Sequence, residues 1–333
     1  MKNILFIATG GTIASLQTER GLAPGIPPDK LIGAVPSVLK YCHVDAITVL
    51  NLDSTNIQPE HWLSMAGCIQ SNYEKYDGFV IAHGTDTMAY TAAALSYLIQ
   101  KPAKPIVITG SQKPVGIDIT DAPKNLTDSF YFCANCGHGG VFVAFDGKVI
   151  VGTRARKVKT QSYDAFDSIN FPIFALTGDH RIVEYISTGP LEGQTEFYSE
   201  LNPKVFLLKL IPGMEPDILD YAANFYDAVI IESYGSGGLP FHEKRNFINK
   251  VEKLSLQGKI IVLATQAMLE GSDIELYEVG KRVQANTQVL ETCDMTVEAA
   301  AAKLMWILPI TRKFDEVKKL FYTQINYDIC WGA

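Results

Sequence analysis

The 333-residue sequence lacks any long apolar run and any excess of positive charge. No segment approaches the roughly 18 unbroken apolar residues that a transmembrane helix requires. The apolar start, Ile4–Ala8, is also shorter than the roughly 7–15 apolar residues of a signal peptide, and polar Thr9 follows it. Because the formal net charge is −7, electrostatics give no support for binding to nucleic acid or to an anionic membrane.

Cysteine is scarce as well. The six cysteines are scattered through a chain that is too large to need disulfides, so we expect reduced thiols and a cytoplasmic location. Cys133 and Cys136 form a C-x-x-C pair, but no second pair completes a zinc site, and Gly137 interrupts the haem-attachment pattern. We interpret these two residues as buried or incidental thiols.

Several familiar motifs are missing from the sequence. The loop "ATGGTIAS", Ala8–Ser15, follows an apolar run, but the next lysine is Lys30, too late for a phosphate-binding Walker loop. The same loop lacks the two later glycines of the dinucleotide fingerprint, and the serine-hydrolase pattern G-x-S-x-G occurs nowhere. Phosphate binding by this loop is therefore disfavoured.

Short apolar runs alternate with longer helical patterns along the whole chain. The runs predict strands at Ile4–Ala8, Ile47–Leu50, Phe79–His83, Ile106–Thr109, Gly140–Phe145, Val205–Leu210, Ala228–Glu232 and Ile260–Ala264. Helices are predicted at Pro59–Lys75, Thr87–Gln100, Pro123–Asn135, Pro216–Phe225, Phe241–Leu256, Thr296–Leu308 and Arg312–Tyr322. This order favours an α/β doubly wound fold with a mostly parallel sheet.

A division into two domains is also predicted. The stretch Thr188–Pro203 is polar, carries glycine and proline, and has no clear period, so we interpret residues 188–203 as a linker. It would separate a larger N-terminal domain, residues 1–187, from a smaller α/β C-terminal domain, residues 204–333.

Polar turns follow four neighbouring strands of the first domain. They are "ATGGT", "LDSTN" (Leu52–Asn56), "HGTDT" (His83–Thr87) and "TGSQ" (Thr109–Gln112). Ligands of doubly wound sheets bind outside the carboxyl ends of the strands, so we expect these turns to meet in one crevice.

Within that crevice, Thr12 has two interpretations. Flanking glycines would let a substrate carbonyl approach its hydroxyl, with Thr85, Asp86 and a lysine as helpers, but a plain strand-to-helix connection would look the same. His83 is either a general base or a satisfied, partly buried histidine. The basic stretch Arg154–Lys159 either faces solvent or reaches the crevice.

Seven segments of the sequence resemble segments of bacterial L-asparaginases of the cytoplasmic type I branch. They are "TGGTIAS", "LDSTN", "DGFVIAHGTDTMAYTAAALSY" (Asp77–Tyr97), "PIVITGSQ", "GTRARKVKTQSYDAFDSIN" (Gly152–Asn170), "VIIESYGSGGLP" (Val229–Pro240) and "MTVEAAAAKLMW" (Met295–Trp306). The resemblance covers nearly the whole chain. It implies the same two-domain α/β fold, with the catalytic residues in the larger domain.

The resemblance implies a role for each residue at its matching position. Thr12 corresponds to the nucleophile that forms an acyl intermediate, and Thr85, Asp86 and Lys157 complete the catalytic group. Asp53, Ser54 and Thr55 correspond to the turn that holds the substrate's α-carboxylate, and Asp86 also meets its α-ammonium. Gly11 and Gly84, which precede the two threonines, are assigned to substrate binding.

The implied reaction is hydrolysis of L-asparagine to L-aspartate and ammonia, without metal or cofactor, by a homodimer or homotetramer. The glycine- and proline-bearing segment Gln17–Pro28 is expected to act as a lid. Leu22 stands where many relatives place a lid tyrosine. Glu232 and Ala267 replace the arginine and cysteine of a regulatory asparagine site.

Two other functions compete with this one. The first is the ammonia-generating, asparaginase-like subunit of a tRNA-dependent amidotransferase. That protein carries an additional N-terminal domain, for which the early position of Thr12 is expected to leave no room. The second is a non-catalytic amino-acid sensor, which the complete set of catalytic side chains disfavours.

Overall fold

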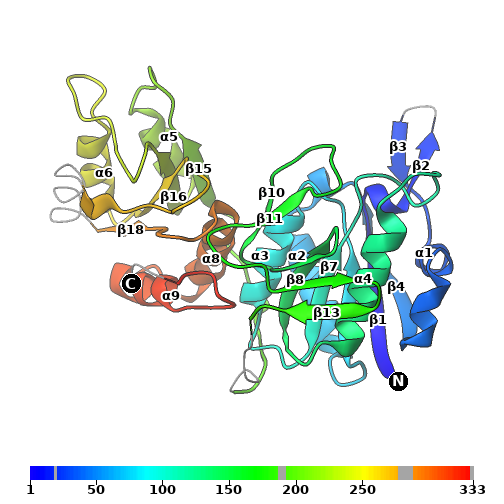
Figure 1. The fold of residues 1–333 in the computed structure, drawn as a ribbon. Helices are drawn as coiled ribbons and strands as arrows, with labels where there is room; N and C mark the ends of the chain where they lie inside the picture. The colour runs from blue at the N-terminus through cyan, green and yellow to red at the C-terminus, as the bar shows by residue number, and fades with distance from the viewer. Residues whose placement is uncertain (19–20, 187–192, 277–287, 331–333) are drawn as a thin grey trace. The chain divides into compact units, whose positions relative to one another are not determined.

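The predicted apolar strands form the parallel core of two separate sheets. The computed structural model describes residues 1–18, 21–186, 193–276 and 288–330. It divides the chain into unit 1, Met1–Ser199, and unit 2, Glu200–Ala333 (Figure 1). The point of division lies inside the stretch predicted as a linker.

Unit 1 is built on an eight-stranded sheet with the order β13-β12-β9-β8-β7-β5-β1-β4. Its strands are β1 (Lys2–Gly10), β4 (Cys42–Leu52), β5 (Gly78–Ala82), β7 (Pro105–Thr109), β8 (Gly140–Phe145), β9 (Lys148–Val151), β12 (Ala175–Gly178) and β13 (Arg181–Glu184). The five strands from β8 to β4 run parallel, whereas β9, β12 and β13 continue the sheet in antiparallel pairs. The predicted doubly wound, mostly parallel N-terminal domain is therefore confirmed.

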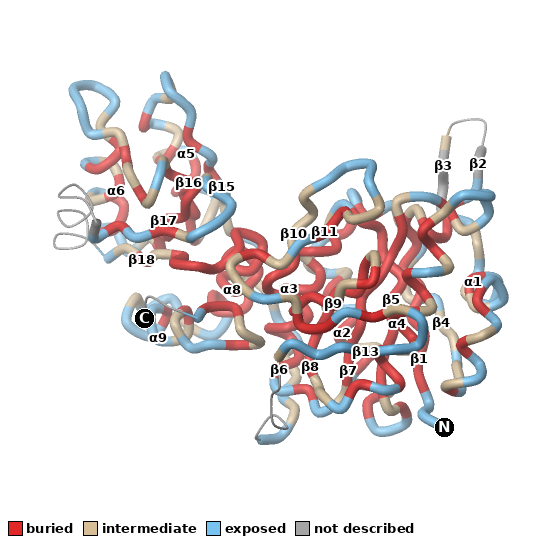
Figure 2. Tube along the Cα trace, in the orientation of Figure 1, coloured by how far each residue is buried: buried red, intermediate tan, exposed pale blue. Residues whose placement is uncertain are grey.

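The central strands of this sheet are buried along their length because helices cover them. The helices of unit 1 are α1 (Pro28–Gly33), α2 (Pro59–Asn72), α3 (Met88–Leu98) and α4 (Ala122–Asn135). α4 packs on β5 and β7, and α2 packs on α3. Every residue of β5, β7 and β8 is buried, and Figure 2 shows these central strands in red. This core holds the loops at the carboxyl ends of the strands in fixed positions.

Three small two-stranded pairs complete unit 1. They are β2 (Ser15–Thr18) with β3 (Gly21–Pro24), β10 (Ala155–Lys157) with β11 (Phe166–Ser168), and β6 (Ile99–Gln100) with β14 (Glu196–Phe197). The predicted lid contains the end of β2 and all of β3, but residues 19–20 and the side chain of Leu22 lie outside what the structure describes. Closure of this segment therefore stays a prediction.

Unit 2 contains a four-stranded parallel sheet with the order β15-β16-β17-β18. Its strands are β15 (Val205–Lys209), β16 (Ala228–Ser233), β17 (Ile260–Thr265) and β18 (Val289–Glu291). Its helices are α5 (Ile218–Phe225), α6 (Phe247–Leu256), α8 (Val297–Ile310) and α9 (Phe314–Tyr322). The predicted smaller α/β C-terminal domain is confirmed.

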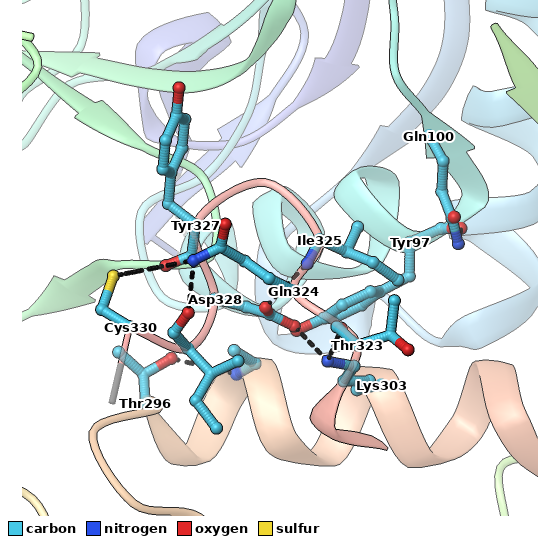
Figure 3. Close-up of polar contacts among 12 residues, drawn as sticks. Tyr97, Gln100, Thr296, Lys303, Thr323, Gln324, Ile325, Tyr327, Asp328 and Cys330 are labelled. Carbon is cyan, nitrogen blue, oxygen red and sulfur yellow. Dashed lines mark hydrogen bonds and ion pairs between the residues drawn. The ribbon is translucent and has the colours of Figure 1, made fainter. Parts of the chain in front are cut away.

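A fully buried ion pair anchors the end of unit 2 (Figure 3). Nζ of Lys303, on α8, lies 2.6 Å from Oδ2 of Asp328, and it also donates a hydrogen bond to the Thr323 carbonyl. Asp328 in turn accepts the Ile325 N–H. Burial lowers the pKa of Lys303, and the adjacent Asp328 carboxylate opposes that shift. Because each charge compensates the other, the segment after α9 is tied to α8.

Several predicted helices differ from the observed ones in their bounds, and two of these differences have an evident structural cause. The helix predicted at Thr87–Gln100 ends at Leu98, because Ile99 and Gln100 extend as β6 to pair with β14. The helix predicted from Phe241 begins at Phe247, where the Asn246 side chain accepts the Asn249 N–H and caps its first turn. In the described part of the chain, none of the helices has the length and apolar character needed to cross a bilayer.

Candidate active site

The loop after β1 is shaped by two consecutive glycines. Gly10 and Gly11 have φ of +99° and +78°, and a Cβ on Gly10 would lie 2.4 Å from the Leu52 carbonyl oxygen. The Gly11 N–H donates to that same carbonyl at 2.9 Å. The chain then turns into a short 3-10 helix, Thr12–Ala14, so Thr12 is presented half-buried at the carboxyl end of β1.

A close backbone contact joins this loop to the loop after β5. A Cβ on Gly11 would lie 2.3 Å from the Gly84 nitrogen and 2.4 Å from its Cα. Any side chain at position 11 would therefore push the two loops apart. Because Thr12 and Thr85 directly follow these two glycines, the contact brings the two threonines to one place. The convergence predicted for the loops after β1 and β5 is observed.

Thr85, Asp86 and Lys157 form one hydrogen-bonded group. Nζ of Lys157, at the end of β10, donates to Thr85 Oγ1 at 2.8 Å and to Asp86 Oδ1 at 2.6 Å. Thr85 is buried, Lys157 is 18% exposed, and Asp86 is 55% exposed. The lysine therefore links a sheltered hydroxyl to a carboxylate that faces solvent. It comes from the basic stretch Arg154–Lys159, for which a solvent-facing position was the other interpretation.

The turn after β4 is hydrogen-bonded to the loop that carries Thr85 and Asp86. Ser54 is buried, its Oγ accepts the Asp86 N–H at 3.3 Å, and its carbonyl accepts the Thr87 hydroxyl at 2.8 Å. Asp53 caps the short helix Ser54–Asn56 by accepting the N–H and the hydroxyl of Thr55. Two exposed residues, Asp53 and Thr55, thus stand beside a buried serine that touches the loop carrying Asp86.

The loop after β7 supplies a residue that the sequence did not single out. Gln112 Oε1 accepts the Thr85 hydroxyl at 3.4 Å, and its Nε2 donates to the Ser162 carbonyl at 3.1 Å. The Asp121 carboxylate holds this loop by accepting the Gln112 N–H at 2.8 Å. The "TGSQ" turn was a signal for Gln112, whereas Asp121 lies at the start of α4 with no local pattern to mark it.

The position of His83 decides between its two interpretations. Its ring is fully buried, Nδ1 lies 2.7 Å from the Gly84 carbonyl oxygen, and Nε2 lies 3.0 Å from Thr91 Oγ1. Burial lowers the pKa of His83 to about 4. A histidine that stays neutral with both nitrogens hydrogen-bonded is poorly suited to act as a general base, so the satisfied, buried interpretation holds.

The C-x-x-C pair is buried, as the sequence predicted. Cys133 donates weakly to backbone carbonyls, and burial raises its pKa well above the usual value. Burial also raises the pKa of Cys136 to about 11. In the described residues, no cluster of three or more histidine, cysteine, aspartate or glutamate side chains is arranged to hold a metal ion.

The loops that carry Thr12 and Thr85 offer backbone donors besides their side chains. Among the described residues, neither the Thr12 N–H nor the Thr85 N–H has a hydrogen-bond partner, and the Thr12 hydroxyl has none either. Hydroxyls and free backbone N–H groups stabilise negative oxygen atoms, and the Asp86 carboxylate suits a cation. This set can bind a zwitterion and stabilise an oxyanion that forms on a neighbouring carbonyl.

Comparison with known proteins gives matches to both parts of the chain. Residues 3–188 match the family model for the N-terminal domain of asparaginase, and residues 204–321 match that for the glutaminase/asparaginase C-terminal domain. The L-asparaginase of Thermococcus kodakarensis is 39% identical over 98% of each chain. The solved structure of the thermostable L-asparaginase from that organism superimposes with a TM-score of 0.93, at 37% identity, over 99% of this chain and 100% of the other.

Two further relatives extend the comparison. L-asparaginase 1 of Escherichia coli is 31% identical, over 96% of this chain and 95% of its own. A glutamyl-tRNA(Gln) amidotransferase chain of Sulfolobus acidocaldarius is 32% identical, over 97% of this chain but only 76% of its own.

Proposed function

The chain belongs to the asparaginase family, and we propose that it hydrolyses the side-chain amide of L-asparagine to L-aspartate and ammonia. The observation that carries the proposal is the hydrogen-bonded group of Thr85, Asp86 and Lys157 on a loop that touches Gly11, next to Thr12. A second threonine, a lysine and a carboxylate beside a glycine-flanked hydroxyl are the parts that a covalent amidase needs.

In the first half of the reaction, the Thr12 oxygen attacks the amide carbon and its proton passes to the group around Thr85. The oxyanion that forms on the carbonyl oxygen accepts hydrogen bonds from the free N–H groups of Thr12 and Thr85. The C–N bond then breaks, the nitrogen takes a proton, and ammonia leaves. An ester between Thr12 and the aspartyl carbonyl remains.

In the second half, a water molecule attacks the ester carbon, and its proton returns the Thr12 oxygen to a hydroxyl as aspartate leaves. The turn of Asp53, Ser54 and Thr55 receives the substrate's α-carboxylate, and Asp86 receives the α-ammonium. Splitting amide cleavage into acylation and hydrolysis replaces one difficult step by two easier ones.

The comparisons also support asparaginase over the amidotransferase alternative. The Thermococcus L-asparaginase is matched along 98% of its length at the higher identity, whereas the Sulfolobus amidotransferase chain is matched along 76%. We propose placement in the bacterial, cytoplasmic type I branch, and the similarity to L-asparaginase 1 of Escherichia coli favours the type I part of that placement. We propose a homodimer or homotetramer, which light scattering of the purified protein would determine.

The test is ammonia release from L-asparagine and from L-glutamine by the wild type and four alanine variants. Thr12→Ala should lower kcat by at least about 1,000-fold, and Thr85→Ala, Asp86→Ala and Lys157→Ala by about 100-fold or more, with folding intact. Thr48→Ala, at an exposed threonine of β4, is the matched control and should keep wild-type activity. Wild-type turnover by Thr12→Ala, or an acyl label on another residue, would contradict the assignment of Thr12. No ammonia release by the wild type would favour a sensor.

A further inference from the structure

A line of buried side chains runs from two helices to the backbone of the site. Trp62 on α2 and Thr91 on α3 are both buried, as is His83, which directly follows β5. Trp62 Nε1 is 3.0 Å from Thr91 Oγ1, which is 3.0 Å from His83 Nε2, and His83 Nδ1 is 2.7 Å from the Gly84 carbonyl oxygen. The reaction scheme uses none of these side chains.

For a neutral His83 ring, the donors and acceptors along this line have only one consistent arrangement. The indole N–H can only donate, so Thr91 Oγ1 accepts from Trp62. The Gly84 carbonyl can only accept, so His83 carries its proton on Nδ1 and donates it to Gly84. Nε2 is then an acceptor and receives the single hydroxyl proton of Thr91. The tautomer and the ring orientation of His83 are both set by its neighbours.

The bond to Gly84 also orients the next residue. The described residues contain no cis peptide bond, and in a planar trans peptide the C=O and the following N–H point in opposite directions. Because the Gly84 carbonyl points at the buried His83 ring, the Thr85 N–H points away from it. That N–H has no hydrogen-bond partner among the described residues, and Thr85 also carries the hydroxyl that accepts a hydrogen bond from Lys157.

Because residue 84 is a glycine, its peptide needs the hydrogen bond from His83 to keep one orientation. A glycine peptide has more conformational freedom than any other, and a Cβ here would lie 2.5 Å from Ser54 Oγ, so a stiffer residue does not fit. Since burial keeps the pKa of His83 near 4, the ring stays neutral and remains a donor to Gly84 throughout the neutral range.

We propose that His83 is a positioning residue, whose Nδ1–H holds the Gly84–Thr85 peptide so that the Thr85 N–H and hydroxyl face the substrate. This inference rests on the proposed amide hydrolysis. His83 touches neither the substrate nor the reacting atoms. Its loss should therefore lower kcat and leave KM for asparagine nearly unchanged, because a misaimed oxyanion donor weakens binding of the transition state more than that of the substrate.

Two substitutions separate the role of Nδ1 from simple filling of space. His83→Asn places an amide N–H near the position of Nδ1 and keeps the donor to Gly84, whereas His83→Gln places its amide near Nε2 and loses that donor. We expect His83→Gln to lower kcat by about 10- to 100-fold with KM within threefold, and His83→Asn to retain most of kcat. Urea unfolding of both variants checks that they are folded under assay conditions. A kcat in His83→Gln equal to or above that in His83→Asn would overturn the proposal.

A second pair tests the far end of the line. Thr91→Val removes the proton that holds Nε2, whereas Thr91→Ser keeps it. Thr91→Val should lower kcat more than Thr91→Ser does. Equal kcat values in the two variants would show that the hydrogen bond from Thr91 to Nε2 does not help to position His83.

Crystal structures of the two His83 variants give a readout that does not depend on activity. A Gly84–Thr85 peptide that is rotated in His83→Gln but not in His83→Asn supports the positioning role, and an unchanged peptide in both refutes it. Absence of ammonia release by the wild type would instead refute the proposed function, and the crystal structures would still decide the role of His83.

Discussion

Replacing Gly11 with alanine tests the contact that brings Thr12 beside Thr85. The backbone of Gly11 has φ +78° and ψ 179°, a region that is essentially restricted to glycine. Forcing another residue into it costs about 1–3 kcal/mol of folding free energy. The added methyl group would also lie 2.3 Å from the Gly84 nitrogen, where a comfortable contact is about 3.5 Å.

These distances set the size of the expected effect. Both near atoms belong to the Gly84 backbone, so no flexible side chain can move aside, and the loops must separate by about 1 Å. A misplacement of about 1 Å in an active site can lower the rate about 100-fold. We therefore expect Gly11→Ala to lose about 1–3 kcal/mol of unfolding free energy and about 100-fold in kcat/KM.

The assay compares ammonia release with urea unfolding for Gly11→Ala and a matched control. Gly67 lies within α2, and a Cβ there meets no atom within 4 Å. Gly67→Ala should keep wild-type activity and gain up to about 1 kcal/mol, because alanine favours a helix over glycine. If Gly11→Ala kept kcat/KM within threefold of the wild type, the close approach to Gly84 would not be what positions the two threonines.

Single contacts give three further predictions. Lys157→Gln keeps a hydrogen-bond donor to Thr85 but has no amine that can gain or lose a proton. We therefore expect kcat for ammonia release to fall about 100-fold. A kcat equal to that of the wild type would exclude proton transfer by Lys157. The pKa of His83 is about 4 in the folded chain against about 6.5 when unfolded, so protons bind the unfolded chain preferentially between these values. The free energy of unfolding therefore falls as the pH falls through this range. Between pH 7 and pH 5, urea unfolding should show that the wild type loses about 2 kcal/mol more of this free energy than His83→Asn does. Equal losses in the two proteins would contradict burial of a neutral ring. Lys303→Met should lower the unfolding free energy by about 3–5 kcal/mol, because it removes the opposite charge from the buried Asp328 carboxylate, and adding Asp328→Leu should recover part of that loss. A double variant less stable than Lys303→Met would contradict that explanation.

Local patterns were sufficient for the fully buried central strands of the large sheet. The apolar run Gly140–Phe145 became β8 with the same bounds, and every residue of that strand is buried. Segments with mixed exposure were harder to predict. β12 and β13, at the edge of the sheet, contain exposed as well as buried or half-buried residues and were missed. The start of α6 was placed at Phe241 because the cap at Asn246 is a single side-chain contact within a polar loop.

The sequence alone determined that this is a doubly wound α/β chain and that polar, glycine-bearing turns follow four of its strands. It did so because apolar periodicity and turn composition are local properties. Only the tertiary structure decided which atoms of those turns meet. Three such features depend on residues from separate elements. They are the contact of Gly11 with Gly84, the hydrogen bonds from Lys157 to Thr85 and Asp86, and the burial of His83. Their geometry depends on the register and packing of the strands between them, which no single segment encodes.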